Sequence, residues 1–133
     1  MAVIVTQNPK DVNEYTITVY NDHEGTVFSD LAETLAELIV HDESLAGTQE
    51  ETIIAETKVE MLAEFMQYLK DCIDDGFVHT IVQCGKVVKN ATTHELFVLG
   101  HVSNVIKNPK LEFVSAKWWD DPKHEAEVIV RMQ

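Results

Sequence analysis

The period of the apolar residues changes at Gly76, and no other pattern in the chain limits the fold as strongly. Before Gly76, apolar residues recur three or four positions apart, as on one buried helix face. They are Val59, Leu62, Phe65, Met66, Leu69 and Ile73. After Gly76, apolar and polar residues alternate in four successive runs, a pattern typical of strands with one buried face. These runs are residues 77–89, 95–106, 111–119 and 125–132.

Short polar stretches separate the four runs. Residues 90–93, 107–110 and 120–122 are rich in Asn, Asp, Thr and Pro, which favour turns. Connections this short join antiparallel neighbours. The C-terminal half is therefore predicted to be a four-stranded antiparallel meander.

The N-terminal half contains two short strand patterns and then two helical ones. Residues 3–5 and 15–20 have strand character. A first helix is predicted to begin near Ser29 or Asp30 and to end before Gly47, because Leu31 and Leu35 start an apolar stripe. A second is predicted from Thr48, where Thr48 and Glu51 have the form of a capping box, to Asp75.

The second predicted helix is long for so small a domain. At 1.5 Å per residue it would extend roughly 35 to 40 Å. We therefore expect it either to kink near the β-branched segment 52–54 or to project and contact another chain.

These patterns predict a single α+β domain over residues 1–133. Two helices would form a layer on one face of an antiparallel sheet, in the order ββ-αα-ββββ. The chain is long enough, and at 45% apolar residues hydrophobic enough, to bury one core.

The net charge of −13 excludes some classes of ligand. Nucleic acids and anionic membranes attract Lys and Arg clusters, so neither is an expected direct partner. The charge is also uneven. Residues 30–75 carry thirteen acids and two lysines, whereas residues 76–133 carry six acids and seven bases.

The acids of residues 30–75 are predicted to share one side of the two helices. A projection at 100° per residue places six of them in an arc opposite the apolar stripe: Glu56, Glu60, Glu64, Asp71, Asp74 and Asp75. The first helix adds Asp30, Glu33 and Glu37. Like charges at this spacing destabilise a helix by roughly 0.2–0.5 kcal/mol per pair, so the arrangement favours a functional surface.

An acidic face of this kind indicates docking on a basic protein, because it speeds association with a cationic patch. The partner could be a protein that otherwise binds nucleic acid, with the acidic face as a partial nucleic-acid mimic. One helix is a poor mimic, since its carboxylates recur about every 6 Å whereas duplex DNA has a charge about every 1.7 Å. The alternative is a solvated face without a partner.

Trp118 and Trp119 are a second candidate contact. Adjacent strand residues point to opposite faces, so helices on one face would leave one ring on the open face. An exposed tryptophan is a common interface anchor.

Evidence for catalysis or metal binding is weak. The chain has no HExxH, CxxC, GxSxG or phosphate-binding glycine motif, and no cofactor or metal is expected. Cys84 and His101 could lie diagonally on one face if residues 77–89 pair with 95–106. Asp71, Asp74 and Asp75 would suit a hard cation, but without a known loop spacing. Cys72 and Cys84 are expected to be free thiols.

The sequence therefore favours a non-enzymatic protein of the cytoplasm that inhibits or regulates a basic partner. It has no signal peptide pattern and no apolar run long enough to span a membrane. One alternative is a self-assembling structural subunit, a virion-like homo-oligomer, in which the sheet half and one of Trp118 or Trp119 form the contact between copies. The other alternative is a small enzyme or metal-binding protein.

Overall fold

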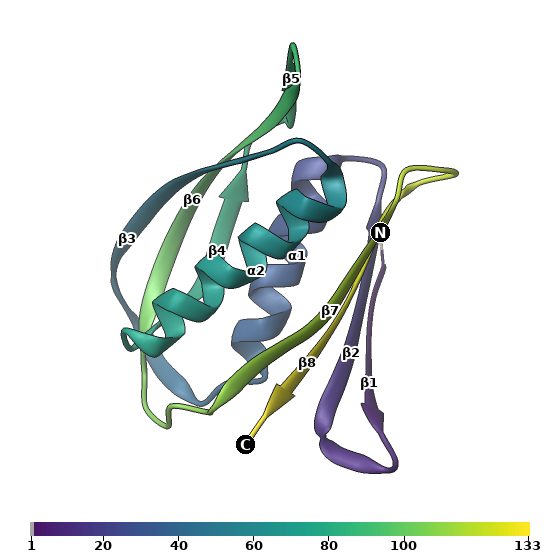
Figure 1. Cartoon of the computed structure of the whole chain (residues 1–133). Helices are drawn as coiled ribbons and strands as arrows, with labels where there is room; N and C mark the ends of the chain where they lie inside the picture. Colours follow the sequence, from purple (N-terminus) through teal and green to yellow (C-terminus); the bar gives the residue numbers. More distant parts are fainter. Residues whose placement is uncertain (1) are drawn as a thin grey trace.

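Two antiparallel sheets enclose two helices in the computed structural model, which describes residues 2–133 (Figure 1). The helices are α1 (Glu24–Glu37) and α2 (Lys58–Asp74). The strands are β1 (Ala2–Asn8), β2 (Asp11–Asn21), β3 (His41–Ala55), β4 (Phe77–Cys84), β5 (Val88–Asn90), β6 (Thr93–Val105), β7 (Leu111–Trp119) and β8 (His124–Met132).

The first sheet has the strand order β1-β2-β8-β7. It joins the two ends of the chain, because β2 pairs with β8 from Glu14 opposite Arg131 to Asn21 opposite His124. Its inner face contributes Ile17, Val19 and Val128 to the core. The alternation of these residues with polar ones explains why the strands form here.

The second sheet has the order β3-β6-β4, and β5 forms a short extra pairing with β6. Val78 and Val82 of β4, with Leu96 and Val98 of β6, face the helices and are buried. The outer face has no covering layer among the described residues, and Ile54, Ile81 and Phe97 are exposed there.

The helices fill the space between the sheets, and each is buried to a different extent. α1 packs against β4 and β2 and is buried around most of its circumference. α2 packs against β7, β3 and β4 and buries one side only. Phe28 of α1 meets Phe65 of α2 edge to face at 5.3 Å, so aromatic contacts hold the helices together at the centre of the core.

The α+β class is confirmed, as are two helices and a C-terminal half made of strands, although the four predicted runs form five strands. These strands divide between the sheets: β4, β5 and β6 belong to one, β7 and β8 to the other. The helices consequently lie between two sheets rather than on one face of a single sheet. The predicted range 77–89 also includes a break, since β4 ends at Cys84 and β5 begins at Val88.

The prediction of a helix from Thr48 to Asp75 is wrong in its first part. Residues 48–55 belong to β3, and the helix begins at Lys58. The β-branched residues 52–54 favour a strand, and Ile53 there is buried against the core. Thr57, and not Thr48, caps the helix, because its Oγ1 accepts a hydrogen bond from the Glu60 N–H at 3.2 Å.

The first helix also differs from its predicted bounds. It begins at Glu24, five residues before Ser29, and ends at Glu37. Residues 41–46, which were predicted to be helical, form the first part of β3. None of the described helices is sufficiently long and apolar to span a membrane.

Candidate interaction surface

A row of exposed carboxylates follows the outer side of α2. The helix turns Met61, Leu62 and Phe65 into the core. The opposite side then carries exposed acids at successive steps of four, seven and three residues. We call this row, together with Glu56 before it and Asp75 after it, the acidic stripe. Its members are Glu56, Glu60, Glu64, Asp71, Asp74 and Asp75.

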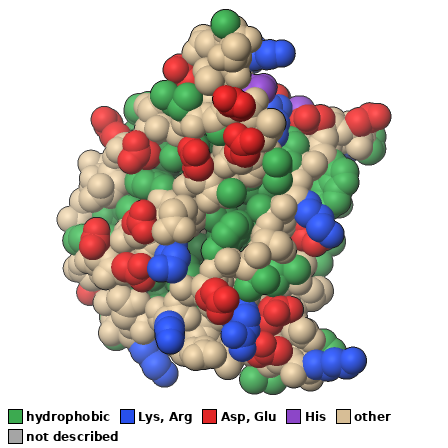
Figure 2. Space-filling view, in the orientation of Figure 1, with side chains coloured by type: hydrophobic (Ala, Val, Ile, Leu, Met, Phe, Trp, Pro, Cys, Tyr) green, Lys and Arg blue, Asp and Glu red, His purple; other side chains and the backbone are tan. Residues whose placement is uncertain are grey.

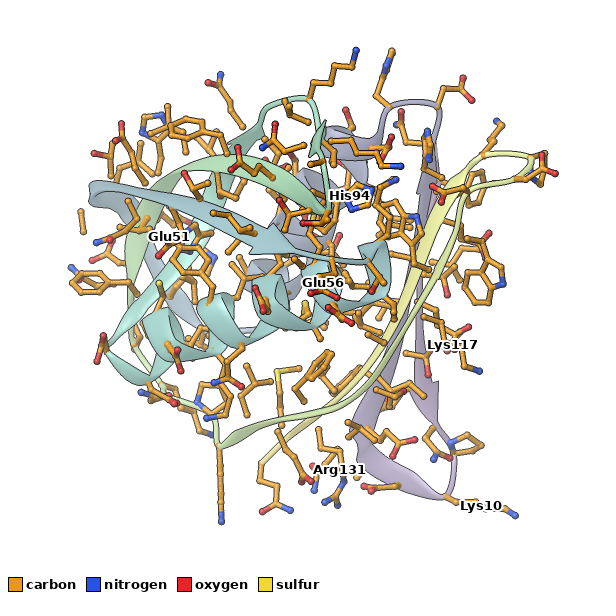
Figure 3. All side chains as sticks on the ribbon, turned by 45° about the horizontal axis from the view of Figure 1, so that its top comes forward. Lys10, Glu51, Glu56, His94, Lys117 and Arg131 are labelled. Atoms are coloured by element: carbon orange, nitrogen blue, oxygen red, sulfur yellow. The ribbon has the colours of Figure 1, made fainter. Side chains whose placement is uncertain are left out.

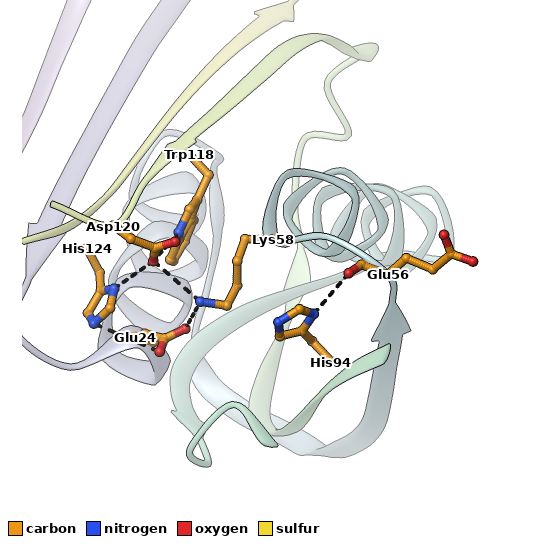
Figure 4. Close-up of polar contacts among 7 residues, drawn as sticks. All are labelled: Glu24, Glu56, Lys58, His94, Trp118, Asp120 and His124. Carbon is orange, nitrogen blue, oxygen red and sulfur yellow. Dashed lines mark hydrogen bonds and ion pairs between the residues drawn. The ribbon is translucent and has the colours of Figure 1, made fainter. Parts of the chain in front are cut away.

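Glu56 lies in the turn before α2 rather than on the helix, contrary to the prediction. Its carbonyl oxygen is 3.1 Å from Nδ1 of His94, so its backbone is tied to β6 while its side chain is exposed (Figure 4). The turn therefore places Glu56 beside the start of the helical row. Glu51, on β3, is also exposed (Figure 3).

In the view of Figure 2, acidic side chains lie over α2 and β3, and further acidic side chains lie on the right-hand side, where Lys and Arg accompany them. The basic residues that Figure 3 labels lie elsewhere: Lys117 and Arg131 on the first sheet, and Lys10 in its β1–β2 turn. Three of the ten Lys and Arg residues thus lie away from the acidic stripe.

The two lysines near the stripe do not neutralise it. Lys70 pairs with Asp74 at 2.9 Å, whereas Lys58 turns inward to Glu24 and Asp120. Within residues 2–133, no ion pair involves Glu56, Glu60, Glu64 or Asp71; Asp71 accepts one hydrogen bond, from Gln67 at 2.8 Å.

The three acids of α1 do not extend the acidic stripe. Glu33 accepts a hydrogen bond from the backbone N–H of Val82 at 2.8 Å, so its carboxylate serves β4. Asp30 is half-buried, and burial together with the neighbouring Glu33 raises the pKa of its carboxyl. Only Glu37 is exposed. The sequence analysis grouped these residues with the acids of α2, but Asp30 is half-buried and Glu33 is bound to β4.

The tryptophans point to opposite faces of β7, as the sequence predicted. Trp118 stacks on Phe28 with ring centroids 5.1 Å apart, and its Nε1 donates to Asp120 at 2.8 Å. Trp119 is 41% exposed on the outer face of the first sheet. It lines a cavity of about 360 Å³ with Tyr20 and residues of the β7–β8 turn. Trp119 is therefore the ring available for an intermolecular contact.

A charged network that the sequence did not reveal joins three elements beneath Trp118 (Figure 4). Lys58 of α2 bonds Glu24 of α1 and lies 3.4 Å from Asp120, and Nδ1 of His124 lies 2.9 Å from Asp120. Burial opposes the charge on Asp120, but bonds from Trp118 and His124 and the charge of Lys58 prevail and lower its pKa. The network anchors the start of both helices to the β7–β8 hairpin.

The same network includes the one group of metal-ligand type among the described residues. Donor atoms of Glu24, Asp120 and His124 lie within 4.8 Å of one another. The ammonium of Lys58 already bridges the two carboxylates. A divalent cation would have to displace this charge, so the residues present fit a structural ion-pair network better than a metal site.

The other chemical candidates from the sequence are not assembled. Cys84 and His101 have different neighbours: β5 keeps the predicted register, with Lys89 opposite His94, but the register changes by one residue between β5 and β4, so Ile81, and not Val82, pairs with His101. Burial raises the pKa of the Cys84 thiol to about 11, which disfavours the nucleophilic thiolate. Both cysteines are free. Asp71, Asp74 and Asp75 do not form a ligand group among the described residues.

Comparisons with known proteins identify the fold. No family model and no curated protein matches the chain. The solution structure of Methanobacterium thermoautotrophicum protein 1598 matches with a TM-score of 0.69 and 14% identity, over 90% of this chain and 92% of that one. A crystal structure from Thermotoga maritima, described as an archease and possible chaperone, matches with a TM-score of 0.51 and 14% identity, over 89% and 88%. At these identities the similarity establishes a shared fold.

Proposed function

We propose that this protein is a non-enzymatic interaction protein that docks its acidic stripe on a basic protein and thereby blocks or regulates it. The observation that carries the proposal is the row of exposed carboxylates on α2. The neighbouring lysines leave most of the negative charge of this row uncompensated. Like charges along one helix face lower its stability, and a basic partner would offset that cost. A partner that otherwise binds nucleic acid has the required positive surface.

The geometry suits a protein surface better than a small ligand. From Glu60 to Asp74 the row is about 21 Å long, at 1.5 Å per residue. It lies on a rigid helix whose opposite side is packed between two sheets, so little order has to be gained on binding. The Thermotoga protein with this fold is described as a possible chaperone, and a chaperone also works by binding other proteins.

Capture from an extract of the organism that makes the protein tests the proposal. The stripe variant carries Glu60→Lys, Glu64→Lys and Asp71→Lys. The control variant carries Asp22→Lys, Glu112→Lys and Asp121→Lys, which are exposed acids outside α2. Each variant brings the net charge from −13 to −7, so the two have the same net charge but change different surfaces.

We expect mass spectrometry to find a basic protein bound to the wild type and to the control variant, and lost from the stripe variant. Circular dichroism establishes that all three proteins are folded. If the same basic protein binds all three equally, docking through the acidic stripe is wrong.

A further inference from the structure

Apart from the three-residue β5, which pairs only with β6, the two sheets have four edge strands, and these edges differ in how they are protected. In the first sheet the edges are β1 and β7, and in the second they are β3 and β4. An edge strand presents unpaired backbone N–H and C=O groups to which another strand can add. Proteins guard such edges with charges, bulges, proline or a covering element.

Three of the four edges carry such protection. On β4, the Glu33 carboxylate binds the Val82 N–H, and α1 packs along the strand. β3 has register shifts at both sides of Leu45 and four acids: Asp42, Glu43, Glu50 and Glu51. β7 has a register shift between Phe113 and Ser115, exposed Glu112 and Lys117, and α2 packed against it.

β1 lacks these devices. Its sequence, AVIVTQN, contains no charge and no proline. It pairs with β2 in a regular register from Ala2 opposite Tyr20 to Gln7 opposite Tyr15, and the register shifts only at its last residue. Val3, Ile4 and Val5 are 40%, 51% and 40% exposed. Figure 1 shows β1 at the outer side of the first sheet, and no helix or strand of residues 2–133 lies beyond it.

We propose that β1 pairs with β1 of a second copy of this chain, so that two four-stranded sheets form one eight-stranded sheet. An antiparallel pairing about a two-fold axis at Ile4 places Ile4 opposite Ile4 of the partner copy and Val3 opposite Val5. Cross-strand pairs of β-branched residues stabilise a sheet, and the same patch on both copies makes a closed dimer.

If two copies pair through an edge strand, charge favours β1 over the other edges. Two molecules of net charge −13 repel each other, and pairing β3 with β3 would bring its acids together. β1 is uncharged and forms the edge of the first sheet opposite β7, the strand against which α2 packs. Copies can therefore meet there at the lowest electrostatic cost and leave the stripes free. The inference is independent of the proposed function.

Sedimentation equilibrium over a series of protein concentrations tests the dimer. We expect the weight-average mass of the wild type to rise from 15.0 kDa towards twice that value. Ile4→Lys would place two lysines opposite each other on the axis and hold the mass at the monomer value. Ile106→Lys, at another exposed isoleucine, makes the same chemical change and should leave dimerisation intact.

A wild type that stays monomeric throughout the series would overturn the proposal. So would a dimer that persists in Ile4→Lys. Amide hydrogen exchange of the wild type provides a test that needs no variant. Amides of β1 should exchange more slowly at high than at low protein concentration, while those of β3 should not change. Protection that is independent of concentration would also overturn the proposal, and capture of a different protein by β1 without self-association would assign the edge to another partner.

Discussion

At the scale of single residues, the buried His79 has the most unusual surroundings. Its side chain is 2% exposed, and its Nε2 is 2.9 Å from the Tyr68 hydroxyl, while Nδ1 is buried without a hydrogen-bond partner among the described residues. The ring lies over Gly100, where any Cβ would collide with it. Burial lowers the pKa of His79 from 6.5 to about 4, and raises the pKa of the Tyr68 hydroxyl.

His79 should therefore make stability depend on pH. The folded protein keeps the ring neutral down to about pH 4, whereas the unfolded chain protonates it below about 6.5, so the unfolded state binds more protons between these values. The contribution of the neutral His79 to the free energy of unfolding is fully present above pH 6.5, and it falls by roughly 3 kcal/mol as the pH drops to 4. Urea unfolding across this range measures the loss. His79→Phe retains a ring and should show a correspondingly smaller loss; equal losses in both proteins would show that His79 is not the cause.

At the scale of secondary structure, predictions succeeded where periodicity was strong and failed where it was absent. The buried residues of α2 repeat at helical spacing, so the helix was recognised. Most of β3 is exposed on both faces, and only Ile53 and Ala55 are buried, so it has no alternation to detect. Glu50 and Glu51 after Thr48 imitate a helix start. The true start, with Thr57 and Glu60, has the same form.

The interaction between Glu33 and β4 gives a prediction at this scale. Glu33→Ala would leave the Val82 N–H at the sheet edge without its acceptor, and we expect a loss of about 1–3 kcal/mol in unfolding free energy. Glu33→Gln keeps an oxygen that can accept the bond and should lose less. Urea unfolding gives the energies, and hydrogen exchange should be faster at the Val82 amide in the alanine variant. An unchanged Val82 exchange rate would show that the carboxylate does not protect this edge.

At the scale of the whole molecule, the chain crosses between sheets where a hairpin was predicted. The 107–110 connection is short enough for a turn, but it leads from β6 in one sheet to β7 in the other. Backbone bonds hold both of its ends: the Ile106 N–H donates to Val40 at 2.9 Å, and the Lys110 N–H donates to Gln133 at 3.0 Å. A connection this short can form either a hairpin turn or this crossing between sheets, so its length alone could not distinguish the two.

The features of the candidate surface that depend on local spacing could be predicted, whereas those that depend on contacts between distant elements could not. The acids of α2 lie on one face because their spacing is local to the helix. Helical spacing alone could not show that Glu33 serves β4 or that Lys58 turns towards Glu24 and Asp120, because these partners come from elements distant in sequence. The fold therefore exposes the acidic stripe on one side of the molecule and the uncharged β1 edge on the other.

Calorimetric titration with a short lysine homopolymer, across a series of salt concentrations, tests most directly whether the stripe is an organised binding surface. The wild type and the control variant should bind with affinities that fall as salt increases. The stripe variant should bind at least about tenfold more weakly at low salt and depend less on salt. Both variants carry the same net charge. Equal losses of affinity in the two would therefore contradict a docking surface on α2 and show that binding depends on net charge alone.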